Sequence, residues 1–442
     1  MNHHLQLTIN YLPLLTLKAD QSNPRAHKPP QVAAIARSIK TFGFNVPILI
    51  DGSGTIIAGH GRLAAAIKLG LSEVPTILVE HLSETQRKAY MIADNRLTDL
   101  SGWDNQLLGE VLRDLSVAEL DFDLDTIGFS VGEIDFRIEA LADEPANDAA
   151  DGPVELGVTP VTRESDLWHC GPHRLLCGNA LDPQVWERLM SGQLGSLGFT
   201  DPPFNVKVHG HVSGLGKVRH REFAMASGEM ARDEFTEFLE TSFRLMAKHS
   251  VPASIHFAAI DWKHVPEMTA AGEAAFTEVK NICVWQKPSG GMGAFYRSQH
   301  ELFFVWKNGR GRHRNNIELG RNGRNRTNIW QYPSAAGFRH SEGADLLATH
   351  PTCKPVALVA DAILDVSKRG EIVIDPFMGS GTTMVAAERV GRVAFGMELD
   401  PLYVDAAIRR FQSLTGHEVF HEDGHTFQEV AAQRALKMEE AA

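Results

Sequence analysis

Residues Asp201-Pro202-Pro203-Phe204 combine groups that could activate an amino group for reaction. They follow an apolar run at 196–200 that predicts a strand. Two consecutive prolines stiffen the turn and remove two backbone donors, which leaves the Asp201 carboxylate and a backbone carbonyl as acceptors. An amino group could donate one hydrogen to each, and Phe204 offers a flat face on which a planar base could stack. Taken alone, the tetrapeptide fits a proline-terminated strand with a core phenylalanine equally well.

A second candidate site is the glycine turn within residues 371–391, where an apolar strand is followed by an amphipathic helix. Gly379 and Gly381 allow the backbone to approach a ligand closely, and the first N–H groups of the helix lack partners. A dinucleotide turn needs a third glycine where this chain has Met384, so a nicotinamide site is disfavoured. The next strand ends at Glu398, whose carboxylate could bind a ribose diol. The pattern predicts an adenosine-type ligand without a strongly anionic tail.

Alternating strands and helices must position these two turns. Beyond residue 160, apolar runs predict strands at SLGFTD, SIHFAA, NICVWQ, ELFFVW, EIVIDP and VAFGME, with amphipathic helical stretches between them. This alternation predicts an α/β fold with a mostly parallel sheet and helices on both faces. Before residue 140, short apolar runs mixed with helical patterns predict a smaller α/β domain.

Composition sets the domain boundaries along the 442 residues, enough for two or three domains of about 150 residues. Residues 141–160 are rich in Ala, Asp, Pro and Gly without apolar periodicity, which predicts a linker. We therefore expect an N-terminal domain at 1–140, a main domain at 161–420 and a polar tail at 421–442.

The charges are unevenly distributed. The formal net charge of −12 argues against a nucleic-acid partner. However, sixteen acidic residues and two arginines occupy 99–155, whereas nine basic and two acidic residues occupy 287–326. A basic block of this kind suits phosphate binding, although most such blocks are solvated surface.

Several classes of protein are disfavoured by composition. With 43% apolar and 22% charged residues the chain is not wholly disordered, and it has no run of about 20 apolar residues that could span a membrane. Four scattered cysteines fit a reducing compartment rather than a disulfide framework. His169, Cys170, His173 and Cys177 have ligand types but not the paired spacing of a zinc site, so we expect a buried hairpin there and no metal.

Four motifs, in this order, resemble those of the amino-group DNA methyltransferases, which methylate adenine N6 or cytosine N4 with S-adenosylmethionine. Residues 201–204 match the D-P-P-Y box with Phe in place of Tyr, and HPTCKP at 350–355 resembles the H-P-T-Q-K-P segment with Cys353 in place of Gln. FMGSG at 377–381 matches the F-x-G-x-G cofactor loop, and ELDPLY at 398–403 its following strand end. The catalytic box precedes the cofactor loop, as in the beta class of that family.

The resemblance implies a Rossmann-like methyltransferase sheet and a site-specific DNA methyltransferase that flips its target base out of the helix. D-P-P rather than S-P-P favours adenine N6 as the acceptor. Asp201 and the Pro202 carbonyl would accept the amino hydrogens, Pro203 would stiffen the turn and Phe204 would stack on the base. Cytosine N4 methylation is the nearest alternative. A ParB-type DNA-binding protein with a degenerate methylase domain is another, which the intact Asp201, Gly379, Gly381 and Glu398 oppose.

The family's site residues carry over by position. The cofactor is expected at Asn179, Lys354, Asp375, Phe377, Gly379, Gly381, Thr382, Glu398 and Asp400, where Asn179 stands in place of the Asp of a G-D-x turn. Read together with the motifs, the basic block becomes a DNA-contacting insertion at about 286–332. Its expected DNA contacts are Lys287, Arg297, Arg312, Arg314, Arg321, Arg324 and Arg326.

The N-terminal domain resembles the ParB-like nuclease superfamily. The matching parts are Asn23-Pro24-Arg25, the helix IARSIKTFGF, the strand PILID, and Gly59-His60-Gly61-Arg62 before a further helix. Gly59, Gly61 and Arg62 could hold phosphate, and a purely structural turn is the open alternative. Partition ParB proteins carry G-E-R-R there and add a helix-turn-helix domain, which we do not expect in this chain. A sulfiredoxin-like function is excluded because His60 stands where the reactive cysteine would be.

These expectations together describe a double-stranded DNA partner, no membrane association, and a cytoplasmic, nucleoid-associated enzyme of bacterial or phage origin. A restriction-modification context fits this description. Whether the chain forms a homodimer is left open.

Overall fold

The structure is a computed structural model that describes residues 7–100, 102–141, 148–152, 154, 156–206, 225–226, 228–290, 295–320, 324–333 and 354–440. The chain forms two compact units, residues 1–142 and 143–442, so the boundary falls at the start of the predicted linker. No helix among the described residues is long and apolar enough to cross a membrane.

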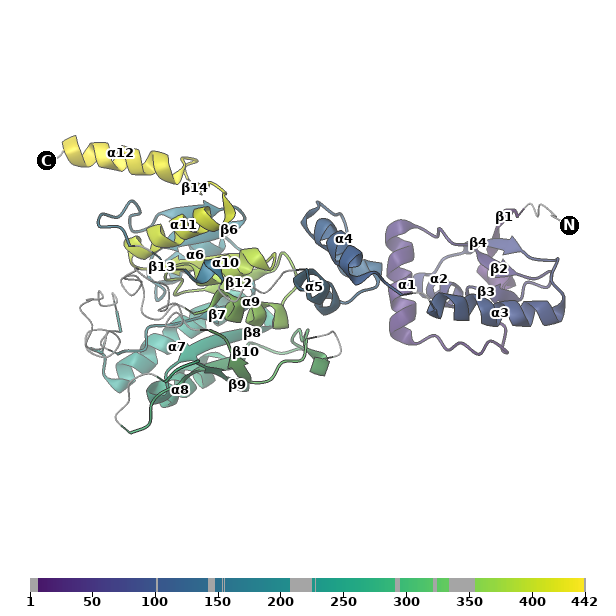
Figure 1. Cartoon of the computed structure of the whole chain (residues 1–442), viewed down its shortest axis with the longest axis horizontal. Coiled ribbons are helices and arrows are strands. Elements are labelled where there is room, and N and C mark those ends of the chain that lie inside the picture. Colours follow the sequence, from purple (N-terminus) through teal and green to yellow (C-terminus); the bar gives the residue numbers. More distant parts are fainter. Residues whose placement is uncertain are drawn as a thin grey trace. The chain divides into compact units, whose positions relative to one another are not determined.

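The first unit contains a four-stranded sheet in the order β1-β4-β2-β3. The strands are β1 (Ile9–Pro13), β2 (Ile48–Ile50), β3 (Ile56–Ala58) and β4 (Glu73–Leu78). Helices α1 (Pro29–Phe42) and α2 (His60–Leu69) complete its small α/β fold (Figure 1), as the sequence predicts. Ile48, Ile56 and Val74 form a small buried core with Leu63 of α2.

Three further helices follow in the first unit: α3 (Glu84–Asp99), α4 (Asn105–Val117) and α5 (Val131–Glu139). Ser83 and Ser130 begin α3 and α5 with capping boxes, which satisfy backbone donors at both helix starts. Helices α4 and α5 approach closely at Gly109, where a Cβ atom would lie 2.8 Å from the Arg137 carbonyl oxygen. The acidic segment is therefore folded into helices through most of its described length.

The second unit is built on a ten-stranded sheet in the order β11-β9-β10-β8-β7-β12-β13-β6-β5-β14. Its strands are β5 (Leu167–Cys170), β6 (His173–Cys177), β7 (Gly195–Thr200), β8 (Ser250–Ile260), β9 (Glu278–Gln286), β10 (His300–Lys307), β11 (Ile329–Gln331), β12 (Ile372–Asp375), β13 (Val393–Glu398) and β14 (Val419–His421). The five central strands, β8, β7, β12, β13 and β6, are parallel.

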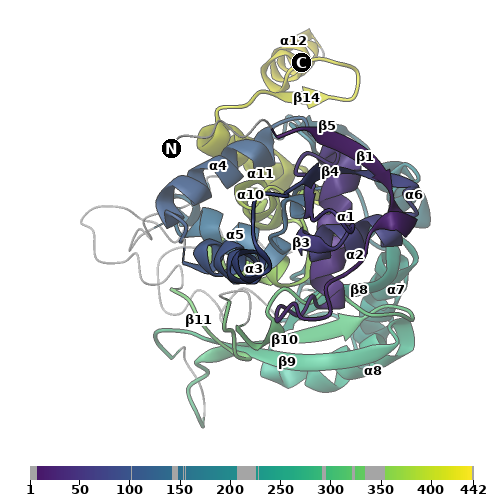
Figure 2. The same cartoon turned by 90° about the vertical axis from the view of Figure 1, so that its right-hand side faces the viewer.

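Both flanks of this sheet are partly antiparallel, so the expectation of a mostly parallel sheet holds only for its centre. Strand β10 pairs antiparallel with β8 and β9, and β5 pairs antiparallel with β6 and β14. Figure 2 shows β9, β10 and β11 along one side of the unit. Hairpin connections such as β5–β6 need no crossover helix, which is why they can run antiparallel.

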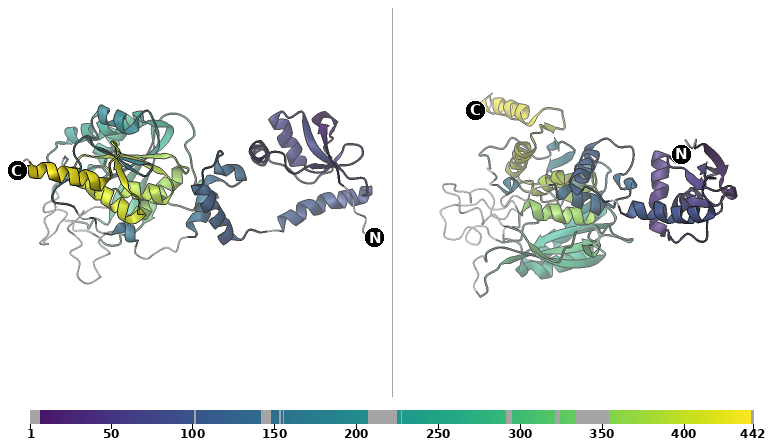
Figure 3. Two further views of the ribbon diagram at one scale, coloured as in Figure 1. Left: turned by 90° about the horizontal axis from the view of Figure 1, so that it is seen from above. Right: turned by 45° about the vertical axis from the view of Figure 1, so that its right-hand side comes forward.

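Helices cover both faces of the central sheet (Figures 1 and 3), as the sequence predicts. They are α6 (Pro183–Met190), α7 (Arg232–Lys248), α8 (Val265–Ala275), α9 (Val356–Val366), α10 (Thr382–Arg389) and α11 (Pro401–Thr415), whereas α12 (Phe427–Glu440) contacts the edge strand β14 (Figure 2). One core contains Val359, Met384 and Phe411, from α9, α10 and α11. The other contains Trp186 and Phe243, from α6 and α7.

Part of the predicted linker is packed against the second unit. Arg410 donates a hydrogen bond to the Ala150 carbonyl oxygen at 2.9 Å, and the Asp151 carboxylate accepts from the Val356 N–H at 2.8 Å. The Asp405 carboxylate accepts from the N–H groups of residues 161 and 162. Within the predicted linker, the Ala150 carbonyl group and the Asp151 carboxylate are therefore bonded to the folded second unit.

Candidate active site

Three carboxylates lie at the ends of neighbouring parallel strands. Asp201 directly follows β7, Asp375 ends β12 and Glu398 ends β13. Parallel strands place their carboxyl ends at one edge of a sheet, which is where ligands bind in folds of this kind. The two turns predicted from the sequence are thus brought together at this edge. Burial, together with the negative charges of Asp201 and Glu398, raises the pKa of Asp375.

A buried lysine holds the Asp201 side chain. Lys354 Nζ donates to Asp201 Oδ2 at 2.6 Å and lies 5.4 Å from the centre of the Phe204 ring. Phe204 is partly buried and packs against both cores, and Pro202 is buried. The Asn205 side chain donates to the Met230 carbonyl oxygen at 2.8 Å, which fixes the end of the box.

The cofactor loop between β12 and α10 is shaped by two glycines. Gly379 and Gly381 have φ of 51° and 83°, a region that favours glycine. A Cβ atom at Gly381 would lie 2.9 Å from the Ala407 Cβ atom, so the loop packs tightly on α11. Glu398 fixes this turn, because its carboxylate accepts from the N–H groups of Gly379 and Asp400, each at 2.9 Å.

Several residues expected to bind the cofactor also support the loop. The Asp375 carboxylate accepts from Thr383 Oγ1 at 2.6 Å and from the Phe377 N–H at 3.0 Å. Burial raises the pKa of Asp375 to about 7. Thr382 Oγ1 accepts from Arg410 Nη1 at 3.0 Å, which anchors the first turn of α10.

Two further residues of the expected cofactor set lie at turns near Glu398. Asp400 Oδ1 accepts from the Leu402 N–H at 3.0 Å and caps α11. Asn179 follows β6, the strand beside β13, and its Oδ1 atom accepts from the Leu181 N–H at 2.9 Å. The Asn179 side chain therefore shapes its own turn.

Lys354, which the sequence predicts as a cofactor residue, contacts the catalytic box. Its side chain is 3% exposed and its ammonium is held between Asp201 and Glu301. Cofactor binding by Lys354 stays a prediction. Glu301 was not predicted as a site residue. An isolated acid at the start of the apolar strand HELFFVW is a signal that could have revealed it, because a buried carboxylate needs a cationic partner.

The residues of the basic block at 287–326 that were expected to contact DNA differ in exposure. Arg297 and Arg312 are exposed, and Arg314 is exposed with Glu371 at 3.3 Å. Lys287 is partly buried and bonded to Glu301. Arg321 and residues 350–353 of the HPTCKP segment lie outside the described residues.

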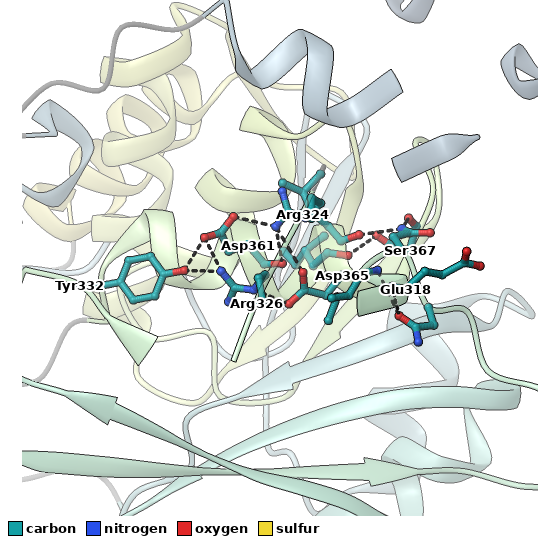
Figure 4. A network of polar contacts seen from close by, with 12 residues as sticks. Glu318, Arg324, Arg326, Tyr332, Asp361, Asp365 and Ser367 are labelled. Carbon is teal, nitrogen blue, oxygen red and sulfur yellow. Dashed lines mark hydrogen bonds and ion pairs between the residues drawn. The ribbon is translucent and has the colours of Figure 1, made fainter. Parts of the chain in front are cut away.

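Arg324 and Arg326 are not available for DNA contacts, which corrects the prediction for both. Figure 4 shows their guanidinium groups between Asp361 and Asp365, one turn apart on α9. Arg326 Nη1 lies 2.7 Å from Asp361 Oδ2, and the Arg324 side chain is only 5% exposed. Burial raises the pKa of Asp365 to about 6, although both arginines oppose this shift. Two acids at i and i+4 in an otherwise apolar helix were the sequence signal for this network.

Replacing Arg326 with methionine should destabilise the protein. The change leaves Asp361 and Asp365 short of one buried counter-charge, a loss that typically costs about 3–5 kcal/mol. Thermal and urea unfolding measure the effect. Arg312→Met is the matched control on the exposed part of the block, and it should leave unfolding unchanged while reducing the salt dependence of DNA affinity. If Arg326→Met unfolds like the parent protein and weakens DNA binding instead, Arg326 is a DNA contact and not a structural residue.

The glycine turn of the first unit is held by internal contacts. Gly59 has φ of 110° and precedes α2, and Arg62 Nη1 donates to the Val46 carbonyl oxygen at 2.8 Å. A Cβ atom at Gly61 would lie 3.1 Å from His27 Nδ1 and from Ile35 Cδ1. These contacts favour the structural turn, and phosphate binding stays a prediction.

The histidine and cysteine cluster is internal. His173 is buried, with Nε2 2.8 Å from Glu388 Oε2 and Nδ1 accepting from the Ala394 N–H. Cys170 and Cys177 are buried in the β5–β6 hairpin, as predicted. Within the described ranges, no group of three or more His, Cys, Asp or Glu residues could hold a metal ion.

Three protein-family models match the chain. A model described as DNA methylase matches residues 196–409, and one described as ParB N-terminal domain matches residues 2–95. A third, described as ParB-methyltransferase HTH domain, matches residues 106–164 and contains most of α4 and all of α5. The expectation that a helix-turn-helix domain is absent was therefore wrong. Leu112 and Ile134 give these helices a buried side, although the segment is acidic in composition.

Individual proteins resemble parts of the chain. The ParB-like nuclease domain-containing protein YnaK of Escherichia coli (strain K12) is 45% identical over 83 residues, 19% of this chain and 95% of YnaK. Type II methyltransferase M2.MboI of Moraxella bovis is 28% identical over 145 residues, 31% of this chain and about half (51%) of that relative. The solved M1.HpyAVI-SAM complex is 19% identical with a TM-score of 0.40, and the match covers 53% of this chain and 97% of that one.

Proposed function

Because the chain belongs to the N6/N4 DNA methylases with an N-terminal ParB-like domain, we propose that it methylates adenine N6 at a specific DNA sequence. S-adenosylmethionine is the cofactor of this enzyme. The observation that carries the proposal is the position of Asp201 at the end of β7, on the same sheet edge as the glycine loop and Glu398.

The residues at this edge suit the cofactor. Gly381 leaves no room for a side chain against α11, and Glu398 presents a carboxylate fixed by two backbone N–H groups. Glu398 would accept from the ribose hydroxyls, and the loop backbone around Gly379 would lie against the remainder of the molecule. The bound cofactor supplies a methyl group on a positively charged sulfur.

The catalytic box would hold the target base beside this loop. An amino group inside a stacked duplex is out of reach, so the base must leave the helix. Asp201 and the Pro202 carbonyl would accept its two hydrogens and raise the electron density on nitrogen, while Phe204 stacks on the ring. Holding the nitrogen in line with the methyl group supplies most of the rate increase. The proton lost from the amine would leave through Asp201 or water.

Adenine is favoured over cytosine by the D-P-P form of the box. Cytosine N4 carries the same pair of amino hydrogens, so the geometry of Asp201 and Pro202 does not by itself distinguish the two bases. A DNA-binding protein with a degenerate methylase domain is disfavoured, because the supporting contacts of Asp201 and Glu398 are all present.

The exposed part of the basic block would contact DNA. Arg297 follows Phe295 and Tyr296, whose side chains are 88% and 82% exposed with ring centres 4.5 Å apart. Arginines suit phosphate contacts, and exposed aromatic rings suit stacking on bases. Arg312 and Arg314 would extend this surface along the chain.

Replacing Phe204 with alanine should weaken capture of the target base. The loss of one stacking face costs about 1–3 kcal/mol, and Phe204→Tyr should retain it. The KM for DNA and the fluorescence of 2-aminopurine at the target position measure base capture. If Phe204→Ala lowers thermal stability but leaves both quantities unchanged, Phe204 is a core residue only.

Expression in a methylation-free host tests the proposal in a cell. Methylation-sensitive sequencing of the host DNA should reveal adenine modified at nearly every occurrence of one sequence. Host DNA without modification, or modification at cytosine, would contradict the proposed activity.

A further inference from the structure

Lys354 is a buried cation between two acids. It lies just before α9, with its ammonium 2.6 Å from Asp201 Oδ2 and 3.1 Å from Glu301 Oε2. Burial alone would lower the pKa of Lys354, but Asp201 and Glu301 raise it above its ordinary value. Lys354 is therefore protonated across the neutral range, and its charge is constant while the enzyme works.

Glu301 is the second anion of the cluster. It lies on β10 with a side chain 9% exposed, and it accepts from Lys287, which follows β9. Burial opposes ionisation of Glu301, but Lys354 and Lys287 together lower its pKa below the ordinary value. Asp201, Lys354, Glu301 and Lys287 thus form a row of alternating charges whose net charge is zero.

The Asp201 carboxylate must be ionised and correctly oriented to accept a hydrogen bond from the amino group, and this row of charges favours both. Asp201 shares its sheet edge with Asp375 and Glu398, and like charges at close range disfavour ionisation. A protonated Asp201 would lose an acceptor for the amino group. A free lysine beside it could rotate among several geometries, whereas Lys354 is fixed by Glu301 on the opposite side.

We propose that Lys354 and Glu301 are positioning residues that keep Asp201 ionised and in one orientation toward the amino group of the target base. Lys287 completes the row by neutralising Glu301. This inference rests on the proposed methyl transfer. It also assigns Lys354 to the acceptor side of the reaction, away from the cofactor.

Among the described residues, the charged groups of this row and of the sheet edge around Asp201 come from five elements. They are Lys354 before α9, Glu301 on β10 with Lys287 after β9, Asp375 at the end of β12 and Glu398 at the end of β13. Removing Lys354 takes away a cation that is bonded to Asp201, while the acids Asp375 and Glu398 stay at the same sheet edge. Removing the charge of Glu301 leaves Lys354 with Asp201 as its acidic partner in the row.

Substitutions at Lys354 and Glu301 give a distinctive pattern of pH dependence. Lys354→Met should lower kcat by about 10²-fold through misplacement of Asp201. In a plot of kcat against pH, it should also shift the acid limb to higher pH by about 1–3 units, because the cation that favours ionisation of Asp201 is lost. Glu301→Gln should lower kcat without moving this limb upward. The double variant, Lys354→Met with Glu301→Gln, should return the acid limb toward its original pH but keep a low kcat.

Conservative and control variants separate positioning from folding. Lys354→Arg keeps the charge and should keep the acid limb in place. Lys307→Met removes a lysine at the far end of the same two strands, where Lys307 lies 3.7 Å from Glu278, and should leave the profile unchanged. Calorimetry should give the same affinity for S-adenosylmethionine in all these variants.

Three results would overturn the inference. One is an unmoved acid limb in Lys354→Met with activity lost in proportion to folded protein, which indicates a structural role. Another is a selective loss of affinity for S-adenosylmethionine in Lys354→Met, which would indicate that Lys354 binds the cofactor. The third is an upward shift of the limb in Glu301→Gln. Failure of the parent protein to methylate DNA would instead defeat the proposed function, so the two failures are distinguishable.

Discussion

Asp201→Asn should abolish methyl transfer to DNA while leaving the affinity for S-adenosylmethionine unchanged. An asparagine presents an N–H group where the reaction needs a second acceptor, and it cannot take up the proton released by the amine. Loss of such a group lowers kcat by about 10²–10⁴-fold. The glycine loop follows β12 and Glu398 ends β13, and this change removes none of the hydrogen bonds that hold them. Transfer of a labelled methyl group and calorimetric titration with the cofactor measure the two quantities.

A matched control is available at the neighbouring strand. Asp261 follows β8, the parallel neighbour of β7, and its Oδ1 atom accepts from the His264 N–H at 3.1 Å. Asparagine is also a good helix cap, so Asp261→Asn should retain activity. If Asp201→Asn retains more than a small fraction of the parent rate, the catalytic assignment of Asp201 is wrong.

Gly381→Val should greatly weaken cofactor binding. The Cβ atom of valine would meet Ala407 at 2.9 Å, and the backbone at φ 83° is strained for any branched side chain. The glycine loop would have to move, and with it the Gly379 N–H that bonds to Glu398. Glu398→Gln should act in the same direction, since a hydrogen bond to a charged group contributes about 1.5–3 kcal/mol. Isothermal calorimetry measures both affinities.

Gly416→Val controls for backbone strain in this experiment. Gly416 has φ of 72° at the end of α11, and a Cβ atom there has no neighbour within 4 Å. The variant should lose stability without losing cofactor affinity. If Gly381→Val and Glu398→Gln both bind S-adenosylmethionine like the parent protein, the cofactor lies elsewhere.

The two turns of the site could be predicted because each is continuous in sequence. An apolar strand followed by Asp-Pro-Pro-Phe, or by a glycine turn, carries its chemistry within a few residues. Parallel strands then bring both turns to one edge whatever the length of chain between them. The central parallel strands follow from the same local patterns.

Contacts between distant segments could not be predicted in this way. Lys354 meets Asp201 across 153 positions, and nothing local to either residue identifies the other. Arg324 and Arg326 resembled their exposed neighbours in the basic block, and only the three-dimensional position of Asp361 and Asp365 places them inside. The helix-turn-helix match at 106–164 was not expected, because acidic residues dominate the composition of this segment.

The packed part of the predicted linker changes how the second unit should be isolated. The Ala150 carbonyl group accepts from Arg410, and the Asp151 carboxylate accepts from the Val356 N–H at the start of α9. A fragment that begins at residue 155 would remove these contacts. A fragment that begins at residue 143, the start of the second unit, would keep them.

Analysis of methylated nucleosides tests the central claim most directly. The purified full-length protein is incubated with unmethylated DNA and S-adenosylmethionine carrying a labelled methyl group, and the DNA is digested to nucleosides for mass analysis. We expect the label in N6-methyldeoxyadenosine, and none in DNA treated with Asp201→Asn. Label in N4-methyldeoxycytidine, or no label in DNA, would contradict adenine methylation by this chain.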